Sequence, residues 1–132
     1  MNIVNEQDLE TQQVALCRKY GQSCVVPAAD TKLGFALGTR GLVPVNGLRH
    51  PPKGDTNGWY IWCGEELSRA ADFFSPMHTA HVKEKCPEAL QFLGLPPGYR
   101  FLVAGEYVDV WYDPTLVDGP ANEGLTNRDA TP

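Results

Sequence analysis

The sequence predicts a single α+β domain, in which an antiparallel or mixed sheet packs against an N-terminal helix and a broken central helix. Apolar residues recur at helical spacing near the N-terminus, strand-like aromatic and β-branched runs follow, and prolines interrupt a second helical segment. With 132 residues, 42% of them hydrophobic, the chain suits one core of ordinary size.

The first element is predicted to be an amphipathic helix over residues 6–20. Its apolar residues lie three and four positions apart, with acids in the first turn and Arg18 and Lys19 in the last. This distribution of charge suits the helix dipole. Gly21 then supplies the residue type that most often ends a helix.

Residues 21–56 are predicted to form short strands or extended loops, because brief apolar runs alternate with Gly and Pro. Residues 31–54 contain Lys and Arg but no acid, so this stretch is locally basic. Within it, the basic, turn-rich residues 49–54 (RHPPKG), which include His50, are expected to form a solvated loop, although they could also hold an anion.

Residues 58–63 are predicted to form a central strand. Side chains alternate along a strand, which places Trp59, Ile61 and Cys63 on one side and Tyr60 and Trp62 on the other. Because both sides are apolar or aromatic, we expect this strand to be covered on both faces.

The broken central helix is predicted over residues 76–93. Ser75 would be its N-cap and Pro76 its first residue, where the missing N–H has no consequence. Pro87 should interrupt the helix after Cys86 and begin a second short helix.

Residues 100–104 and 107–112 are predicted to form a β-hairpin around Gly105-Glu106. A two-residue turn there sets the register. One side of the hairpin would then be dry, with Phe101 facing Val110 and Val103 facing Val108.

The other side of this hairpin would carry Tyr107, Asp109 and Trp111. Arg100 would lie diagonally from Asp109, close enough to pair with it. Tyr and Trp are residues that anchor protein interfaces, so this side is a candidate binding surface unless a helix covers it.

The ordered domain is predicted to span residues 1–117. The segment 118–132 lacks any apolar pattern and is predicted to be a mobile acidic C-terminal tail.

The composition disfavours several classes of partner. A net charge of −5 and a pI near 5.1 would repel phosphates, so no nucleic-acid partner is expected. The first residues do not resemble a secretory signal, and no stretch has the roughly 18 apolar residues of a membrane span. We therefore expect a cytoplasmic protein without a membrane partner. No glycine-rich phosphate motif is present, so no cofactor is expected.

Two groups of residues invite a catalytic interpretation. Glu65 and Glu66 could act as acid and base, but adjacent side chains diverge and do not easily bracket one bond. A small metal- or thiol-dependent enzyme could be built from Cys63, His78, His81 and Cys86, because thiolate and imidazole are side-chain types that bind zinc. The spacing is unspecific, and free, mostly buried thiols are the expected state of the four cysteines.

Several motifs in order resemble a known family. The segments NGWYIWCGEELS, DFFSPMHTAHVKEKCPE, FLGLPPGYRFLVA and YVDVWYD are similar to those of the Imm33-like domain, over about residues 20–117. Members are small bacterial proteins assigned as immunity proteins of polymorphic toxin systems. The resemblance implies a non-enzymatic cytosolic protein that binds and neutralises a toxin encoded beside it, and it brings no catalytic residues.

An acidic surface bearing aromatic side chains would complement a toxin with a basic surface. The candidate partner-binding residues are Glu65, Glu66, Tyr107, Asp109, Trp111 and Asp113. Two alternatives remain open: the metal- or thiol-dependent enzyme, and a regulatory module that binds a small ligand in a pocket lined by Trp59, Trp62 and Trp111.

Overall fold

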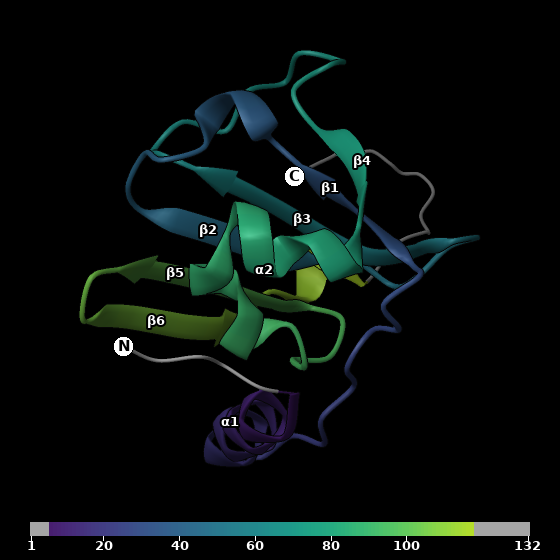
Figure 1. Cartoon of the computed structure of the whole chain (residues 1–132), viewed down its shortest axis with the longest axis vertical. Coiled ribbons are helices and arrows are strands. Elements are labelled where there is room, and N and C mark those ends of the chain that lie inside the picture. Colours follow the sequence, from purple (N-terminus) through teal and green to yellow (C-terminus); the bar gives the residue numbers. More distant parts are fainter. Residues whose placement is uncertain (1–5, 118–132) are drawn as a thin grey trace.

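A six-stranded mixed sheet, in the order β4-β1-β3-β2-β5-β6, forms the centre of the computed structural model, which describes residues 6–117 (Figure 1). The strands are β1 (Lys32–Phe35), β2 (Val45–Arg49), β3 (Thr56–Cys63), β4 (Ser75–His78), β5 (Tyr99–Ala104) and β6 (Tyr107–Tyr112). β1 and β3 are parallel, and the other neighbouring pairs are antiparallel. The predicted α+β class with an antiparallel or mixed sheet is confirmed. The expected tail, residues 118–132, lies outside the described residues.

The helices are short except for the first. They are α1 (Glu6–Lys19), α2 (Val82–Lys85) and the 3₁₀ turns η1 (Leu37–Thr39), η2 (Thr79–His81), η3 (Pro87–Phe92) and η4 (Pro114–Leu116). α1 ends as predicted, because Gly21 takes a φ of +72° and its N–H donates to the carbonyl of Arg18. The α2–η3 break is also confirmed at Cys86, which has a non-helical backbone before Pro87.

The prediction that a helix begins at Pro76, with Ser75 as its N-cap, is wrong. Residues 75–78 form β4, which pairs antiparallel with β1 and places Pro76 opposite Gly34. A proline without an N–H is tolerated in an edge strand as readily as in a first helical turn, so the local pattern fits both structures. Pairing with β1 decides between them, since that strand would otherwise lack a neighbour on its outer side.

The main core lies between the sheet and the layer formed by α1, α2 and η3, with α2 in front of the sheet in Figure 1. Trp59 and Ile61 are fully buried there. Phe92 of η3 stacks on Phe101 of β5, with ring centroids 4.3 Å apart and an interplanar angle of 9°. Val82 of α2 joins the same cluster. Apolar burial of this kind is the largest favourable contribution to folding.

A smaller apolar cluster covers the opposite face of the sheet. It contains Trp62 and Leu48 from the central strands and Leu116 from η4. Phe74, from the segment that follows β3, packs edge-on against the ring of Trp62, with centroids 6.2 Å apart. The prediction that β3 is covered on both faces is therefore confirmed.

Arg49 corrects the expectation that residues 49–54 form a solvated loop. It is the last residue of β2, and only 2% of its surface is exposed. Its guanidinium donates hydrogen bonds to the carbonyls of Asn57 (3.0 Å), Val25 (2.7 Å) and Leu95 (2.8 Å). The residue therefore joins three segments inside the fold, and it contributes nothing to a basic surface.

Candidate functional site

One face of the β5–β6 hairpin is left without a covering helix among the described residues. The helical layer packs on the other face, where Phe92 meets Phe101. Tyr107 is 60% exposed and Asp109 is exposed, while Trp111 is partly exposed beside them. The predicted register is confirmed, so these three candidate residues do share a face.

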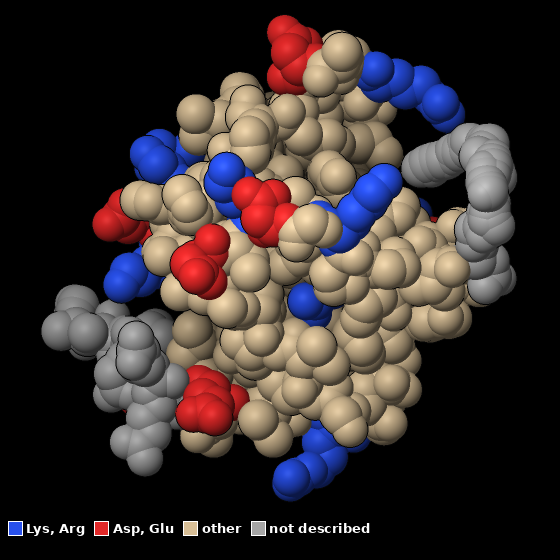
Figure 2. Space-filling view, turned by 90° about the vertical axis from the view of Figure 1, so that its right-hand side faces the viewer, with Lys and Arg blue, Asp and Glu red and all other residues tan. Residues whose placement is uncertain are grey.

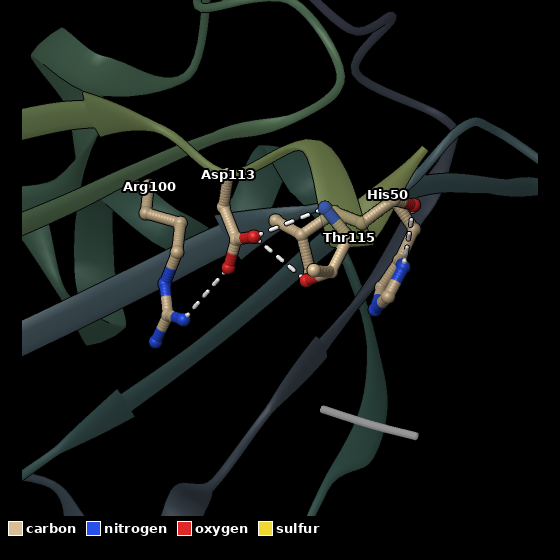
Figure 3. A network of polar contacts seen from close by, with 5 residues as sticks. His50, Arg100, Asp113 and Thr115 are labelled. Atoms are coloured by element: carbon tan, nitrogen blue, oxygen red, sulfur yellow. Dashed lines mark hydrogen bonds and ion pairs between the residues drawn. The ribbon is translucent and has the colours of Figure 1, made fainter. Parts of the chain in front are cut away.

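Asp113 belongs to a polar network at the far end of this face (Figure 3). Its Oδ2 lies 3.2 Å from Arg100 Nη1, and its Oδ1 accepts hydrogen bonds from Thr115 N (3.1 Å) and Thr115 Oγ1 (2.6 Å). The predicted pairing of Arg100 with Asp109 is therefore wrong. Both acids lie diagonally from Arg100 across the hairpin, but only Asp113 is also held in place by the turn η4.

The network sets the charge of Asp113. Burial raises the pKa of its carboxyl, but the hydrogen bonds from Thr115 and Arg100 outweigh that effect, so the pKa lies below its ordinary value. Arg100 also lies over the ring of Trp111, with its guanidinium carbon 5.4 Å from the ring centroid. Asp113 thus has a structural role as the cap of η4, in addition to any contact with a partner.

His50 links η4 to the sheet on the same side. Its Nδ1 lies 3.2 Å from the carbonyl oxygen of Leu116, and since a carbonyl only accepts, Nδ1 carries the proton (Figure 3). Burial lowers the pKa of the imidazole, which is therefore neutral at pH 7. The ring meets that of Tyr60 edge-on, with centroids 5.6 Å apart.

A cavity of about 400 Å³ opens beside His50. Its walls are aromatic and aliphatic, and Arg69 adds a cation from the segment after β3. The lining residues are Leu48, His50, Tyr60, Leu67, Ser68, Arg69 and Phe74. No sequence pattern indicates this cavity, because its walls come from β2, β3 and a loop that are separated along the chain.

Glu65 and Glu66 are exposed, but they do not adjoin Asp109. They follow the C-terminal end of β3, which is a central strand, so they do not extend from an edge strand of the sheet. Two strands separate β3 from β6, a distance of about 14 Å at the usual strand spacing. The acid nearest to Tyr107 along the hairpin is Glu106 in its turn, which the sequence reasoning did not select.

The four residues of the metal or thiol alternative do not come together. Cys63 and Cys86 are buried side by side, and burial, reinforced by Cys63, raises the pKa of the Cys86 thiol to about 12. His78 and His81 are exposed. Within residues 6–117, no group of three or more His, Cys, Asp or Glu side chains is placed to hold a metal ion. All four cysteines are free thiols, and three of them are buried.

The three tryptophans do not line one pocket. Trp59 lies in the main core, where its Nε1 donates to the carbonyl of Leu93 at 3.0 Å. Trp62 is buried in the cluster on the opposite face, and its Nε1 has no hydrogen-bond partner among residues 6–117. Trp111 lies on β6 of the hairpin, and two strands, β2 and β5, separate it from β3.

Surface charge is mixed on the side of the molecule seen in Figure 2. Lys and Arg are interspersed there with Asp and Glu, between wide areas that carry neither. Among the described residues, that side shows no extended patch of one charge, so electrostatic attraction to a partner there would depend on single charged side chains. No helix in the described part of the chain is long and apolar enough to cross a membrane.

Comparison with known proteins identifies a family. A family model of the Imm33-like domain matches residues 12–113, which is most of the chain. Neither the curated proteins nor the solved structures contain a significant match. The matched range includes the second half of α1, the whole sheet and the hairpin with its uncovered face. The chain therefore belongs to the Imm33-like domain family.

Proposed function

We propose that this chain is an immunity protein that binds a cognate bacterial toxin domain in the cytoplasm and neutralises it by direct contact, without catalysis. Family membership supports an immunity role in general. The observation that carries the proposal for this chain is the uncovered face of the β5–β6 hairpin. Tyr107 and Trp111 are available there beside the exposed carboxylate of Asp109.

The chemistry of this face suits a protein partner with a basic surface. Tyrosine and tryptophan bury large areas with little loss of side-chain entropy, and they dominate the energetics of many interfaces. Asp109 has no ion pair within the described part of the chain, so its carboxylate is available to a Lys or Arg of the toxin. Glu65 and Glu66 would act at longer range, by increasing the rate of encounter.

The test is a titration of the chain with the C-terminal domain of the protein encoded beside it. We expect nanomolar affinity, one-to-one stoichiometry and loss of toxin activity. Asp109→Lys should weaken binding at least about tenfold, because it places a cation against the basic surface of the toxin. Asp30→Lys is the matched control, since it makes the same charge change at an exposed turn before β1, four strands from β6.

Two results would contradict the proposal. A neighbouring toxin that is folded and active but is not bound would exclude immunity for this pair. Equal weakening by Asp109→Lys and Asp30→Lys would instead exclude the hairpin face as the binding surface, and net charge would then account for the effect.

The cavity beside His50 supports a second candidate function, the binding of a small carboxylate. A volume of about 400 Å³ is within the range of small-ligand sites. Arg69 has no ion pair within the described residues, and the rings of Tyr60 and Phe74 supply apolar walls. Benzoate should then cause saturable NMR shifts around Tyr60 that Arg69→Gln removes and Arg40→Gln, at an exposed arginine outside the cavity, does not. Absence of saturable shifts would exclude this function for aromatic carboxylates.

A further inference from the structure

We propose that the toxin binds by adding an extended strand to the free edge of β6, so that the six-stranded sheet continues into the partner. This inference rests on the proposed immunity function and names the geometry of the contact. In Figure 1, β6 forms the lower edge of the sheet, and it pairs only with β5 among the described strands. Strand addition to such an edge is a common mode of peptide recognition.

The direction of the backbone groups follows from the register. Gly98 continues the β5–β6 register opposite Asp113, and the Asp113 N–H donates to the Gly98 carbonyl at 2.7 Å. Backbone groups of an antiparallel strand alternate between its two neighbours. Since Asp113 faces β5, so do the other odd-numbered residues of β6. Its even-numbered residues, Val108, Val110 and Tyr112, therefore direct their N–H and C=O groups away from the sheet.

β6 lacks several of the features that normally protect an edge. Its pairing with β5 is continuous over six residues without a bulge, and it contains no proline or lysine. Val108 is 42% exposed and Tyr112 is 49% exposed. The opposite edge differs, because β4 has only four residues and includes Pro76.

The side chains along the edge define what the added strand would carry. On the side of the main core, Val108 and Tyr112 offer apolar contacts, so apolar residues are expected next to them. On the uncovered side, a Lys or Arg of the added strand is expected next to the carboxylate of Asp109. The partner is thus an extended segment in which apolar residues alternate with at least one basic residue.

A second copy of this chain fits the edge less well. β6 contains Asp109 but no basic residue, and Arg100 of the neighbouring strand is already paired with Asp113. Self-pairing would therefore bring together two acidic strands and leave both Asp109 carboxylates without a cation. A basic strand from another protein satisfies them.

Amide hydrogen exchange by NMR tests the inference, with the chain alone and in complex with the neighbouring toxin domain. In the free chain, the amides of Val108, Val110 and Tyr112 should exchange fast, while those of Tyr107, Asp109 and Trp111 are protected by β5. In the complex, the three even-numbered amides should gain at least about tenfold protection.

Each other outcome overturns strand addition. Even-numbered amides that stay unprotected in a neutralised one-to-one complex exclude it while leaving the immunity function intact. Protection in the free chain that grows with concentration, together with a dimer in sedimentation, assigns the edge to a second copy. If the even-numbered amides are already protected in the free monomer, another segment of this chain covers the edge of β6. Absence of toxin binding would instead remove the proposed function itself.

A pair of variants provides an independent test. Val108→Pro removes an outward N–H and places a ring at the edge, without removing a hydrogen bond to β5. Val108→Thr keeps the N–H and the β-branched shape. If the strand is added, Val108→Pro should weaken toxin binding at least about tenfold relative to Val108→Thr. Equal affinities in two folded variants would overturn the inference, and hydrogen exchange on the unmodified chain decides the question if the proline variant does not fold.

Discussion

At the scale of single residues, Arg49 is buried and is held by contacts to several segments of the fold. Arg49 donates to four backbone carbonyls and has no carboxylate partner among the described residues, and its guanidinium carbon lies 5.6 Å from the ring centroid of Trp59. Burial lowers the pKa of its guanidinium to about 10, so the group remains charged at neutral pH. Its planar set of donors matches diverging carbonyls that a lysine ammonium cannot reach together.

Replacement of Arg49 should destabilise the protein strongly. Arg49→Met fills a similar volume but leaves buried carbonyls without a donor, which we expect to lower the free energy of unfolding by about 3 kcal/mol. Urea denaturation followed by tryptophan fluorescence measures this change. Arg40→Met, at an exposed arginine, is the control and should change stability by less than about 0.5 kcal/mol. Equal stability of the two variants would show that the carbonyls find other partners.

His50 should make stability depend on pH. The pKa of its imidazole is about 6.5 in an unfolded chain and lower in the fold, so the unfolded state binds the proton more strongly. The free energy of unfolding should therefore fall as the pH drops below about 6.5 and through the folded pKa. His50→Asn keeps a donor for the Leu116 carbonyl but does not titrate.

Urea denaturation of both proteins at about pH 7.5 and about pH 5.5 measures the effect of His50. We expect the unmodified chain to lose more stability than His50→Asn over this interval. The exposed His78 and His81 are common to both proteins and cancel in the comparison. Identical losses would show that His50 does not control the pH dependence.

At the scale of elements, η4 shows how a short turn acquires a fixed position. Asp113 caps it through Thr115, Arg100 pairs with the same carboxylate, and Leu116 enters the smaller apolar cluster. A single 3₁₀ turn is unstable by itself, so these contacts hold it against the sheet.

Asp113→Ala should lower the free energy of unfolding by about 1–2 kcal/mol, because it removes the cap and the partner of Arg100. Asp109→Ala is the matched control on the same hairpin face, and we expect it to change stability by less than about 0.5 kcal/mol. Thermal denaturation measures both. For toxin affinity we expect the reverse order: Asp109→Ala should weaken toxin binding more than Asp113→Ala does. A destabilised Asp109→Ala would indicate a structural partner for that carboxylate.

Some elements could be predicted from their own residues and others could not. The β5–β6 register follows from a two-residue turn and from alternating side chains, both of which are local features. Ser75-Pro76 is equally compatible with the start of a helix, and only the need of β1 for a neighbour makes residues 75–78 a strand. The pairing of Arg100 with Asp113 depends in the same way on η4, which the sequence pattern did not reveal.

At the scale of the whole molecule, the described residues form two apolar clusters on the two faces of one sheet. The uncovered hairpin face and the free edge of β6 lie together at one end of the strand order. A partner that extended the sheet there would also reach Tyr107 and Trp111, so edge and face form one continuous surface.

Removal of residues 118–132 should leave the melting temperature and the toxin affinity unchanged. The apolar clusters found among residues 6–117 already cover both faces of the sheet, and the proposed binding surface lies on β5 and β6. A chain that ends at residue 117 is compared with the full chain. Differential scanning calorimetry measures the melting temperatures, and a toxin titration measures the affinities. A melting temperature lower by more than about 4 °C would show that the removed segment contributes to the fold.

The sequence by itself determined the fold class, the central position of β3, the hairpin register and the family resemblance, because turn chemistry and side-chain periodicity act between residues close in the chain. Only the tertiary structure decided that β4 is a strand, that Arg49 is buried, that the Cys and His residues do not form one site, and that β6 is an edge strand of the described sheet. These features depend on which segments become neighbours in space, and that depends on the packing of the whole chain.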